Sequence, residues 1–205
     1  MMKVIKFILN VCLLVAAIFL GYSYITKQGI FQVRHHDSTN VTPDGSYTDT
    51  SFTLTNQDGH TVNSHDFQGK YMLVLFGFSS CESICPAELG LASEVLSQLG
   101  NDADKLQVIF ITIDPINDTV EKLKKFHDHF DSRIQMLTGN TEDIKQIIQN
   151  YNIYVGQPDK DNQISHSTIM YILDTKGKYL TYFYPDLQAE KNQADELLSI
   201  IKQYL

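Results

Sequence analysis

The stretch YMLVLFGFSSCESICPAELGLASEVLSQL, residues 71–99, decides the fold, because a buried strand, two cysteines and a helix follow one another within it. Residues 71–78 form a continuous apolar run of strand length, which is typical of a central sheet strand. From Pro86 to Leu99, apolar side chains recur at helical spacing. Cys81 and Cys85 therefore lie on the loop at the carboxyl end of a strand, where open α/β sheets carry their chemistry.

The rest of the chain continues this alternation of strands and helices. Strand-like runs cover residues 106–113 and 134–139, and helix-like runs cover 117–130, 141–151 and 189–204. Two hairpins are expected, around Asp58-Gly59 near the start and around residues 175–177 near the end. Sequential strands with helical crossovers form parallel pairs, and a closing hairpin adds antiparallel ones. This order predicts an α/β, thioredoxin-like fold with an N-terminal β-hairpin.

Composition limits the classes of partner. The chain has 205 residues, of which 43% are hydrophobic and 20% charged, as expected for one folded domain with a tail. Since Lys3 and Lys6 are the only charged side chains in residues 1–26, removing their +2 from the net charge of −8 leaves −10 on the remainder. Such an acidic body repels phosphate backbones, so nucleic acid is not an expected partner.

The N-terminal segment predicts a membrane anchor. Residues 7–25 contain no charged side chain, a length that just spans a bilayer core of about 30 Å as a helix. Lys3 and Lys6 precede it and favour a cytoplasmic location for the N-terminal residues 1–6, with the anchor at 7–26. The alternative is a signal peptide that is cleaved near Gly21-Tyr22-Ser23. Both interpretations send the rest of the chain out of the cytoplasm.

Residues 27–49 are polar and carry turn signals, so we expect a tether between the anchor and a folded domain at 50–205. No Arg-rich amphipathic transit peptide is present, which favours a bacterial envelope over a mitochondrion. The expected location is the bacterial inner membrane, crossed once, with the folded domain in the periplasm.

The spacing of Cys81 and Cys85 leaves three roles open. A disulfide is plausible outside the cytoplasm, although closing so short a loop stabilises little. A redox pair is a second possibility, because a thiol beside a helix N-terminus is readily ionised. Metal binding is the third, since thiolates bind soft ions. His166, just before a strand-like run, is a candidate third ligand, and two thiolates with one imidazole suit copper above all. A lone histidine at such a place is otherwise a surface or capping residue.

Several longer stretches carry a family resemblance. DFQGKYMLVLFGFSSCESICP, TIDPINDT, MLTGNTEDIKQIIQNYNIY and SHSTIMYILDTKGKYLTYF occur in this order over residues 50–205. The chain resembles the Sco/SenC family of copper-binding, membrane-anchored, thioredoxin-like proteins that assist cytochrome c oxidase assembly. The resemblance implies that Cys81, Cys85 and His166 bind a copper ion, Cu(I) or Cu(II). It also implies delivery of copper to the binuclear copper centre of the oxidase, whose copper-bearing subunit is the expected partner.

The sequence departs from the family pattern beside the expected ligands. Glu82-Ser83 stands where the family often has Pro-Asp, and Ser165 stands where Asp often precedes the histidine. The stretch before the histidine, residues 156–165, is short and poor in glycine. These changes leave the ligands intact and affect their surroundings, which tune affinity and potential.

Two points stay open at this stage. Asp114 ends a buried strand at the same edge as the cysteines, so it is either a carboxylate that supports the metal site or a turn residue that bonds nearby amides. The function is open between a metal carrier, which breaks no substrate bond, and a thiol–disulfide oxidoreductase that keeps acceptor cysteines reduced. Either role needs a thiol reductant as a partner in an oxidising compartment.

Overall fold

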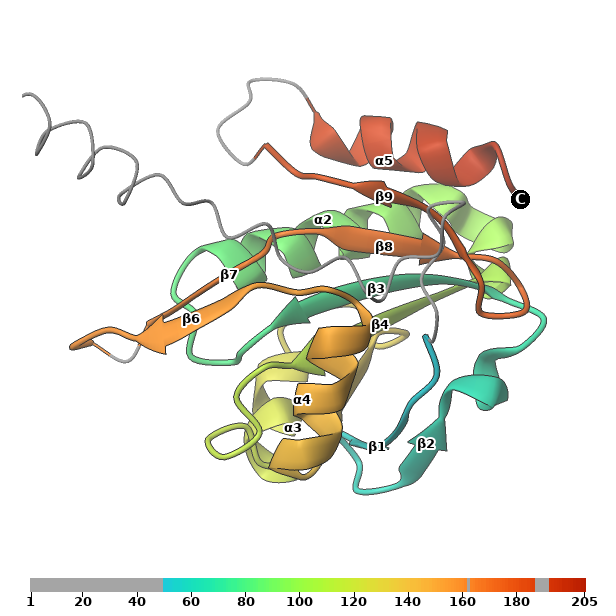
Figure 1. Ribbon diagram of the computed structural model, residues 1–205. Helices are drawn as coiled ribbons and strands as arrows, with labels where there is room; N and C mark the ends of the chain where they lie inside the picture. Colours follow the sequence, from blue (N-terminus) through green and yellow to red (C-terminus); the bar gives the residue numbers. More distant parts are fainter. Residues whose placement is uncertain (1–49, 162, 187–191) are drawn as a thin grey trace, which may run out of the picture. The chain divides into compact units, whose positions relative to one another are not determined.

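The central element is a seven-stranded sheet in the order β2-β1-β5-β4-β3-β8-β9 (Figure 1). The computed structural model describes residues 50–161, 163–186 and 192–205. The strands of this sheet are β1 (Thr53–Asn56), β2 (Thr61–Asn63), β3 (Tyr71–Gly77), β4 (Leu106–Thr112), β5 (Gln135–Thr138), β8 (Met170–Leu173) and β9 (Tyr179–Phe183). β3, β4 and β5 run parallel, whereas β1, β2, β8 and β9 join by antiparallel pairing.

Within the described residues, four α-helices cover the two faces of this sheet. α2 (Ile84–Leu99) and α5 (Gln193–Lys202) pack against each other on one face, and α3 (Val120–His127) and α4 (Thr141–Asn150) lie on the other (Figure 1). The side chains of Thr119, Asn140 and Asn192 each accept a hydrogen bond from a backbone N–H of the first turn that follows. These caps set where α3, α4 and α5 begin. Short 3-10 helices follow β2 (Ser64–Phe67) and α2 (Gly100–Lys105).

The core lies around β3 and β4, which occupy the middle of the sheet. Leu73, Val74, Val108 and Ile109 have no exposed surface, as expected for parallel strands that are covered on both faces. The mixed α/β order, both hairpins and the buried strand at residues 71–78 are therefore as predicted. The carboxyl ends of β3 and β4 meet at one edge of the sheet, and the loops that follow them carry the candidate site.

The structure corrects two boundaries. α2 begins at Ile84 rather than near Pro86, so Cys85 belongs to the helix and not to the loop. α3 ends at His127, although the sequence predicted a helix through Phe130. Phe130 is held by a turn, with its N–H bonded to His127 O at 2.9 Å, and its ring still packs on Phe126. The expected start of the last helix, at Ala189, lies outside the described residues.

A second, two-stranded sheet was not predicted. β6 (Val155–Pro158) and β7 (Ile164–His166) form an antiparallel hairpin that projects past the end of β3 (Figure 1). Its residues are mostly polar and Pro158 ends β6, which hid the strand pattern in the sequence. The stretch before His166, for which the sequence predicted no strand, is therefore a hairpin that holds the histidine at its end.

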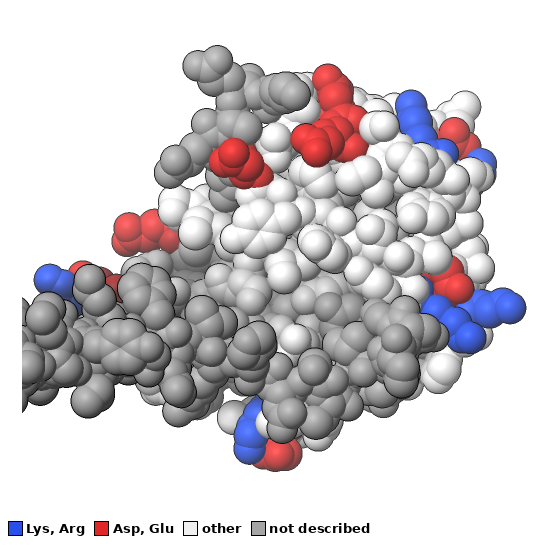
Figure 2. All heavy atoms as spheres, turned by 45° about the horizontal axis from the view of Figure 1, so that its top comes forward, with Lys and Arg blue, Asp and Glu red and all other residues white. Residues whose placement is uncertain are grey.

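Few charged side chains are visible in the part of Figure 2 that the described residues occupy. Among the described residues, Asp and Glu lie mainly along the upper rim of this view, and Lys and Arg lie mainly at its right edge, with an uncharged area between them.

The predicted anchor at 7–26 and tether at 27–49 lie outside the described residues. Within the part of the chain that the structure describes, no helix has the length and apolar character needed to cross a bilayer.

Candidate metal centre

The two cysteines occupy different surroundings although four positions separate them. Cys81 closes a tight turn after β3, in which its N–H donates to Phe78 O at 3.1 Å, and its side chain is partly exposed. Cys85 lies in the first turn of α2 and is fully buried. The Cys85 N–H points at Cys81 Sγ at 3.5 Å, and both residues are free thiols in the structure. A backbone donor of the helix N-terminus is therefore directed at the exposed sulfur.

A glycine makes room for the buried sulfur. A Cβ atom placed on Gly77 would lie 2.6 Å from Cys85 Sγ and 2.8 Å from the Phe110 ring. Real Cβ contacts are not that short, so the close approach of β3 and α2 requires glycine at this position. A glycine inside a strand is a recognised sign of close backbone approach, and this signal was present in the sequence but not used.

His166 reaches the cysteines from the end of β7, 81 positions away in the sequence. Its Nε2 lies 3.6 Å from Cys85 Sγ, and its Nδ1 bonds to Ser167 O at 2.9 Å. Because a carbonyl oxygen only accepts, Nδ1 carries the hydrogen of this bond, and Nε2 is left to accept a proton or a metal. The Phe78 ring meets the imidazole edge to face and limits its rotation. The structure thus brings together all three residues that were predicted as ligands.

The two thiols ionise very differently. The pKa of Cys81 is lowered to about 3, chiefly by the hydrogen bond from Cys85 and, against the effect of burial, also by a hydrogen bond with His166. The pKa of Cys85 is raised far above the ordinary thiol range, because its proton is held by Cys81 and because the group is buried. At neutral pH the reduced pair therefore holds one thiolate, on the more exposed Cys81, and one thiol.

A buried carboxyl group lies behind the pair. Glu88, one helical turn after Cys85, is only 2% exposed, and burial raises its pKa to about 8, with His166 opposing this shift and Cys81 adding to it. Burial also disfavours a charged His166, but its hydrogen bonds with Cys81 and Ser167 outweigh this effect, and its pKa is raised. Sequence reasoning missed Glu88, although helical spacing places it on the same face as the buried Cys85 and Ala92.

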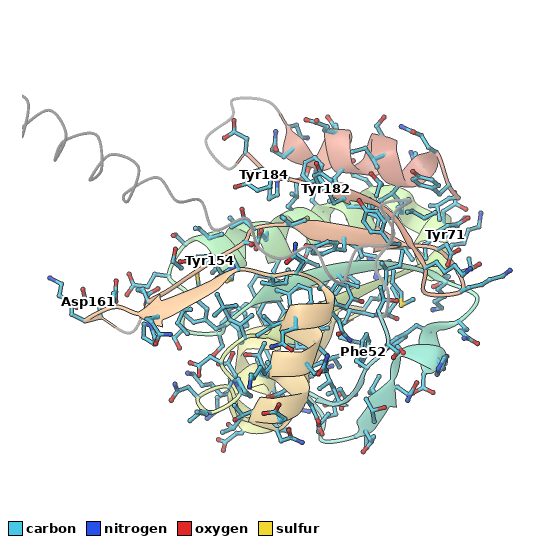
Figure 3. The ribbon with its side chains drawn as sticks, viewed as in Figure 1. Phe52, Tyr71, Tyr154, Asp161, Tyr182 and Tyr184 are labelled. Carbon is cyan, nitrogen blue, oxygen red and sulfur yellow. The ribbon has the colours of Figure 1, made fainter. Side chains whose placement is uncertain are left out.

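The site opens to solvent through a pocket of about 320 Å³. The pocket lies between the cysteine loop and the β6–β7 hairpin, and its lining includes Cys81, Ile84, Gln157, Asp159 and His166. Figure 3 shows the hairpin extending from Tyr154 toward Asp161, beyond the body of the sheet. Tyr154 itself is 58% exposed. A small ion or a partner's side chain can therefore reach the exposed sulfur and the imidazole from the same side.

The donor set fits copper chemically. Over the residues that the structure describes, no three His, Cys, Asp or Glu side chains are already arranged as a finished metal site. The fit therefore rests on the donors themselves, two sulfurs and one imidazole nitrogen, which suit a soft ion. With metal–ligand bonds near those of zinc sites, a sulfur and a nitrogen on one three-coordinate ion would lie roughly 3.7 Å apart. The 3.6 Å between Cys85 Sγ and His166 Nε2 matches that separation.

Asp114, the predicted supporting carboxylate, bonds within its own turn. Its two carboxylate oxygens accept from Asn117 Nδ2 at 3.1 and 2.8 Å, which is the arrangement expected of a turn residue. Its supporting role at the metal site stays a prediction. The carboxylate that contacts the cysteine loop is Asp118, which accepts from Ser79 N at 3.0 Å. The sequence predicts a helix from residue 117, but α3 begins at Val120 with Thr119 as its cap, so Asp118 precedes the helix.

Comparison with known proteins places these features in a family context. The family model described as SCO1/SenC matches residues 40–204. The chain is 33% identical over 191 residues to an SCO2-like protein of Rickettsia felis, covering 90% of this chain and 91% of that protein.

Solved structures agree with the predicted thioredoxin-like fold. The fold is similar to that of Bradyrhizobium japonicum ScoI with copper bound, with a TM-score of 0.65 and 34% identity over 76% of this chain and 98% of that one. It is also similar to BsSco, a member of the Sco family of cytochrome c oxidase assembly proteins in which a disulfide switch was identified. For BsSco the TM-score is 0.62 and the identity 27%, over 75% of this chain and 91% of that one.

Proposed function

Since the chain belongs to the SCO1/SenC family, we propose that it binds copper and takes part in cytochrome c oxidase assembly by delivering copper to the binuclear copper centre of the oxidase. Cys81, Cys85 and His166 are the proposed copper ligands, and copper is the cargo rather than a resident cofactor. The copper-bound structure of the Bradyrhizobium relative supports the choice of metal. The partner is the copper-bearing subunit of the oxidase.

One observation carries this proposal: the imidazole of a distant strand faces the cysteine pair at the mouth of an open pocket. Cys85 Sγ lies 3.6 Å from His166 Nε2, and Cys81 and His166 both line the pocket. A plain structural disulfide has no use for an imidazole whose free nitrogen points at it. Two sulfurs, one imidazole and access from solvent are what a carrier of a soft ion needs.

Loading requires a reduced and deprotonated pair. Cys81 is already a thiolate at neutral pH, so binding must displace the proton of Cys85 and any proton on His166. The raised pKa of Glu88 leaves this buried carboxyl group mainly protonated at neutral pH, so it adds no full negative charge beside the ligands. In an oxidising compartment, an external thiol reductant keeps the pair open for the next ion.

The release of copper follows from the unequal exposure of its three proposed ligands. Cys85 is buried at the base of the site, whereas Cys81 and His166 reach the pocket, so a thiolate of the acceptor meets these two ligands first. Copper then passes by stepwise exchange of ligands, and no bond of a substrate is broken. This chemistry describes a carrier and not an enzyme.

A thiol–disulfide oxidoreductase is the second candidate. The ionised, exposed Cys81 beside the protonated, buried Cys85 is the arrangement of an attacking and a resolving thiol. Cys81 would attack an acceptor disulfide, Cys85 would release the acceptor as a dithiol, and a Cys81–Cys85 disulfide would remain for an external thiol to reduce. The disulfide switch identified in BsSco favours keeping this candidate.

We place the chain at the bacterial inner membrane, with residues 1–6 in the cytoplasm, 7–26 as the anchor, 27–49 as a tether and 50–205 in the periplasm. The uncharged run at 7–25 and the bacterial relatives support this arrangement. The tether would leave the pocket free to approach an oxidase subunit in the same membrane.

A transfer experiment separates the two candidates. The full chain in detergent, loaded anaerobically with one Cu(I), is mixed with a copper-free, reduced acceptor domain of the oxidase. The two proteins are then separated and assayed for metal. We expect copper on the acceptor. Copper that stays on the donor, together with reduction of an oxidised acceptor by the copper-free chain, would favour the oxidoreductase instead.

A further inference from the structure

Asp118 is a fully buried carboxylate outside the proposed ligand set, and it holds the loop that carries Cys81. It has no exposed surface, and it lies between the end of β4 and the start of α3. A charged group in such a place is expected only where hydrogen bonds replace water. The hydrogen-bond partners of Asp118 therefore indicate which part of the structure it holds in place.

The acceptor positions of the Asp118 carboxylate are all used. Oδ2 accepts from the Ser79 N–H at 3.0 Å and from Thr112 Oγ1 at 2.7 Å. Oδ1 accepts from the Ser79 hydroxyl and faces Lys122 Nζ at 3.8 Å. A carboxylate offers about four lone-pair directions, and here each one meets a donor or a cation. An amide in its place would turn an N–H₂ group toward these donors.

Two of these bonds hold one residue of the cysteine turn. Ser79 lies two positions before Cys81, inside the turn that the bond from Cys81 N–H to Phe78 O closes. Asp118 fixes Ser79 through its backbone and its side chain, whereas the next residue, Ser80, is held only from the surface, by Lys122 and Gln163. The buried anchor of this turn among the described contacts is therefore Asp118.

The same carboxylate links this turn to the neighbouring strand end. Thr112, the last residue of β4, donates its hydroxyl proton to Asp118 and accepts from the Asp114 N–H at 2.9 Å. The Gly77 carbonyl accepts from the Ile113 N–H at 2.8 Å, so the ends of β3 and β4 are also joined directly. A shift of Asp118 would loosen both the turn that carries Cys81 and the turn at Asp114-Pro115.

We infer that Asp118 is a positioning residue for the copper ligand Cys81: by fixing Ser79 it keeps the Cys81 sulfur within reach of Cys85 and His166. This inference rests on the proposed copper-binding function. Asp118 touches neither copper nor the acceptor. Because Asp118 already orders the turn that carries Cys81, copper binding does not have to order it. Substitution of residues of this kind typically lowers metal affinity about 10–100-fold.

Three single variants of the reduced full chain and one double variant, Asp118→Asn with Ser79→Ala, test the inference. Asp118→Asn keeps the shape and removes the acceptor, and Ser79→Ala removes one donor on a partly exposed loop. Glu121→Gln is the matched control, because it makes the same change of acid to amide on an exposed side chain of α3. Cu(I) affinity is measured by competition with a chelator, and urea unfolding reports the fraction folded.

We expect Asp118→Asn to weaken Cu(I) binding by about 10–100-fold and Ser79→Ala by at least about threefold, with Glu121→Gln within about twofold of the parent. The double variant should lose little more than Asp118→Asn alone, because both changes remove the same contact. Affinities of Asp118→Asn and Ser79→Ala that match Glu121→Gln would overturn the inference. If Asp118→Asn does not fold, Ser79→Ala alone decides.

A second readout separates this inference from the proposed function. The rate at which the backbone N–H groups of Ser79 and Cys81 exchange hydrogen with solvent in the copper-free chain reports how firmly the turn is held, and we expect it to rise at least about fivefold in Asp118→Asn and measurably in Ser79→Ala. A parent that binds no copper contradicts the copper function, and the hydrogen-exchange rates then decide the positioning role. Unchanged rates in both variants would refute it.

Discussion

Cys81 and Cys85 show how strongly position can divide two residues of one type. Cys81 sits at a turn facing a helix N-terminus and ionises readily, and Cys85 is buried one turn into α2 and keeps its proton. The sequence indicated the pair and its place beside a helix. It did not indicate which thiol would ionise, because that depends on Gly77, Phe78 and His166 packing around the sulfurs.

Glu88→Gln should stabilise the reduced protein at high pH and not at low pH. Burial raises the Glu88 pKa from 4.5 to about 8, so the protonated form is favoured in the folded state. This contribution is fully present below pH 4.5 and is lost as the pH rises toward 8, where folding must bury a charge. Glutamine carries no such charge, so the variant should gain roughly 3–5 kcal/mol over the parent between these limits.

Urea unfolding of the parent and Glu88→Gln at pH 4.5 and pH 8.5 measures this difference. Glu94→Gln, on the exposed side of α2, is the control and should show no such trend. A stability difference that is the same at both pH values would contradict the assignment of Glu88 as a buried, titrating group.

At the scale of elements, the long periodic segments were predictable and the short polar ones were not. The apolar runs at β3 and β4 and the helical stripe of α2 were found because burial imposes a strong pattern. The β6–β7 hairpin was missed because its side chains are mostly exposed or half-buried and leave no such pattern. His166 was proposed as a ligand, but the element that delivers it was not foreseen.

Gly77→Ala tests the packing of β3 against α2. The new methyl group would meet Cys85 Sγ and the Phe110 ring, so the helix start has to shift. We expect a loss of about 1–3 kcal/mol in the free energy of unfolding, together with weaker Cu(I) binding. Both are measured on the same preparation, by urea unfolding and by chelator competition.

Gly90→Ala is the matched control on α2. A Cβ at Gly90 meets nothing within 4 Å, so alanine should raise stability by about 0.4–1 kcal/mol through the unfolded state, with copper binding unchanged. Equal effects of the two substitutions would show that the close contact at Gly77 does not support the site.

At the scale of the whole molecule, the fold gathers residues from three regions at one edge of the sheet. The cysteine turn follows β3, Asp114 and Asp118 follow β4, and His166 comes from the hairpin before β8. Parallel pairing of β3 and β4 was predictable and explains why their loops meet. It was not predictable that Asp118 rather than Asp114 bonds to the cysteine loop. Both carboxylates lie in the same turn, and only side-chain geometry separates them.

The full chain should behave as an integral membrane protein through residues 7–26. When it is expressed in a bacterium, we expect it in the membrane fraction after alkaline carbonate washing, with the domain at 50–205 open to protease added from the periplasmic side. A version that begins at residue 30 is the comparison. Recovery in the periplasmic extract of a chain that has been cleaved near residue 23 would support the signal peptide instead.

Cu(I) binding by the fully reduced chain, under anaerobic conditions, tests the central claim most directly. Stoichiometry and affinity are measured by chelator competition for the parent, for His166→Ala and for His65→Ala, an exposed histidine away from the pocket. The account predicts one tightly bound copper per chain, lost or weakened by at least about tenfold in His166→Ala and unchanged in His65→Ala. Weak binding by the parent, or equal binding by His166→Ala, would contradict the three-ligand site and leave Cys81 and Cys85 as a redox pair.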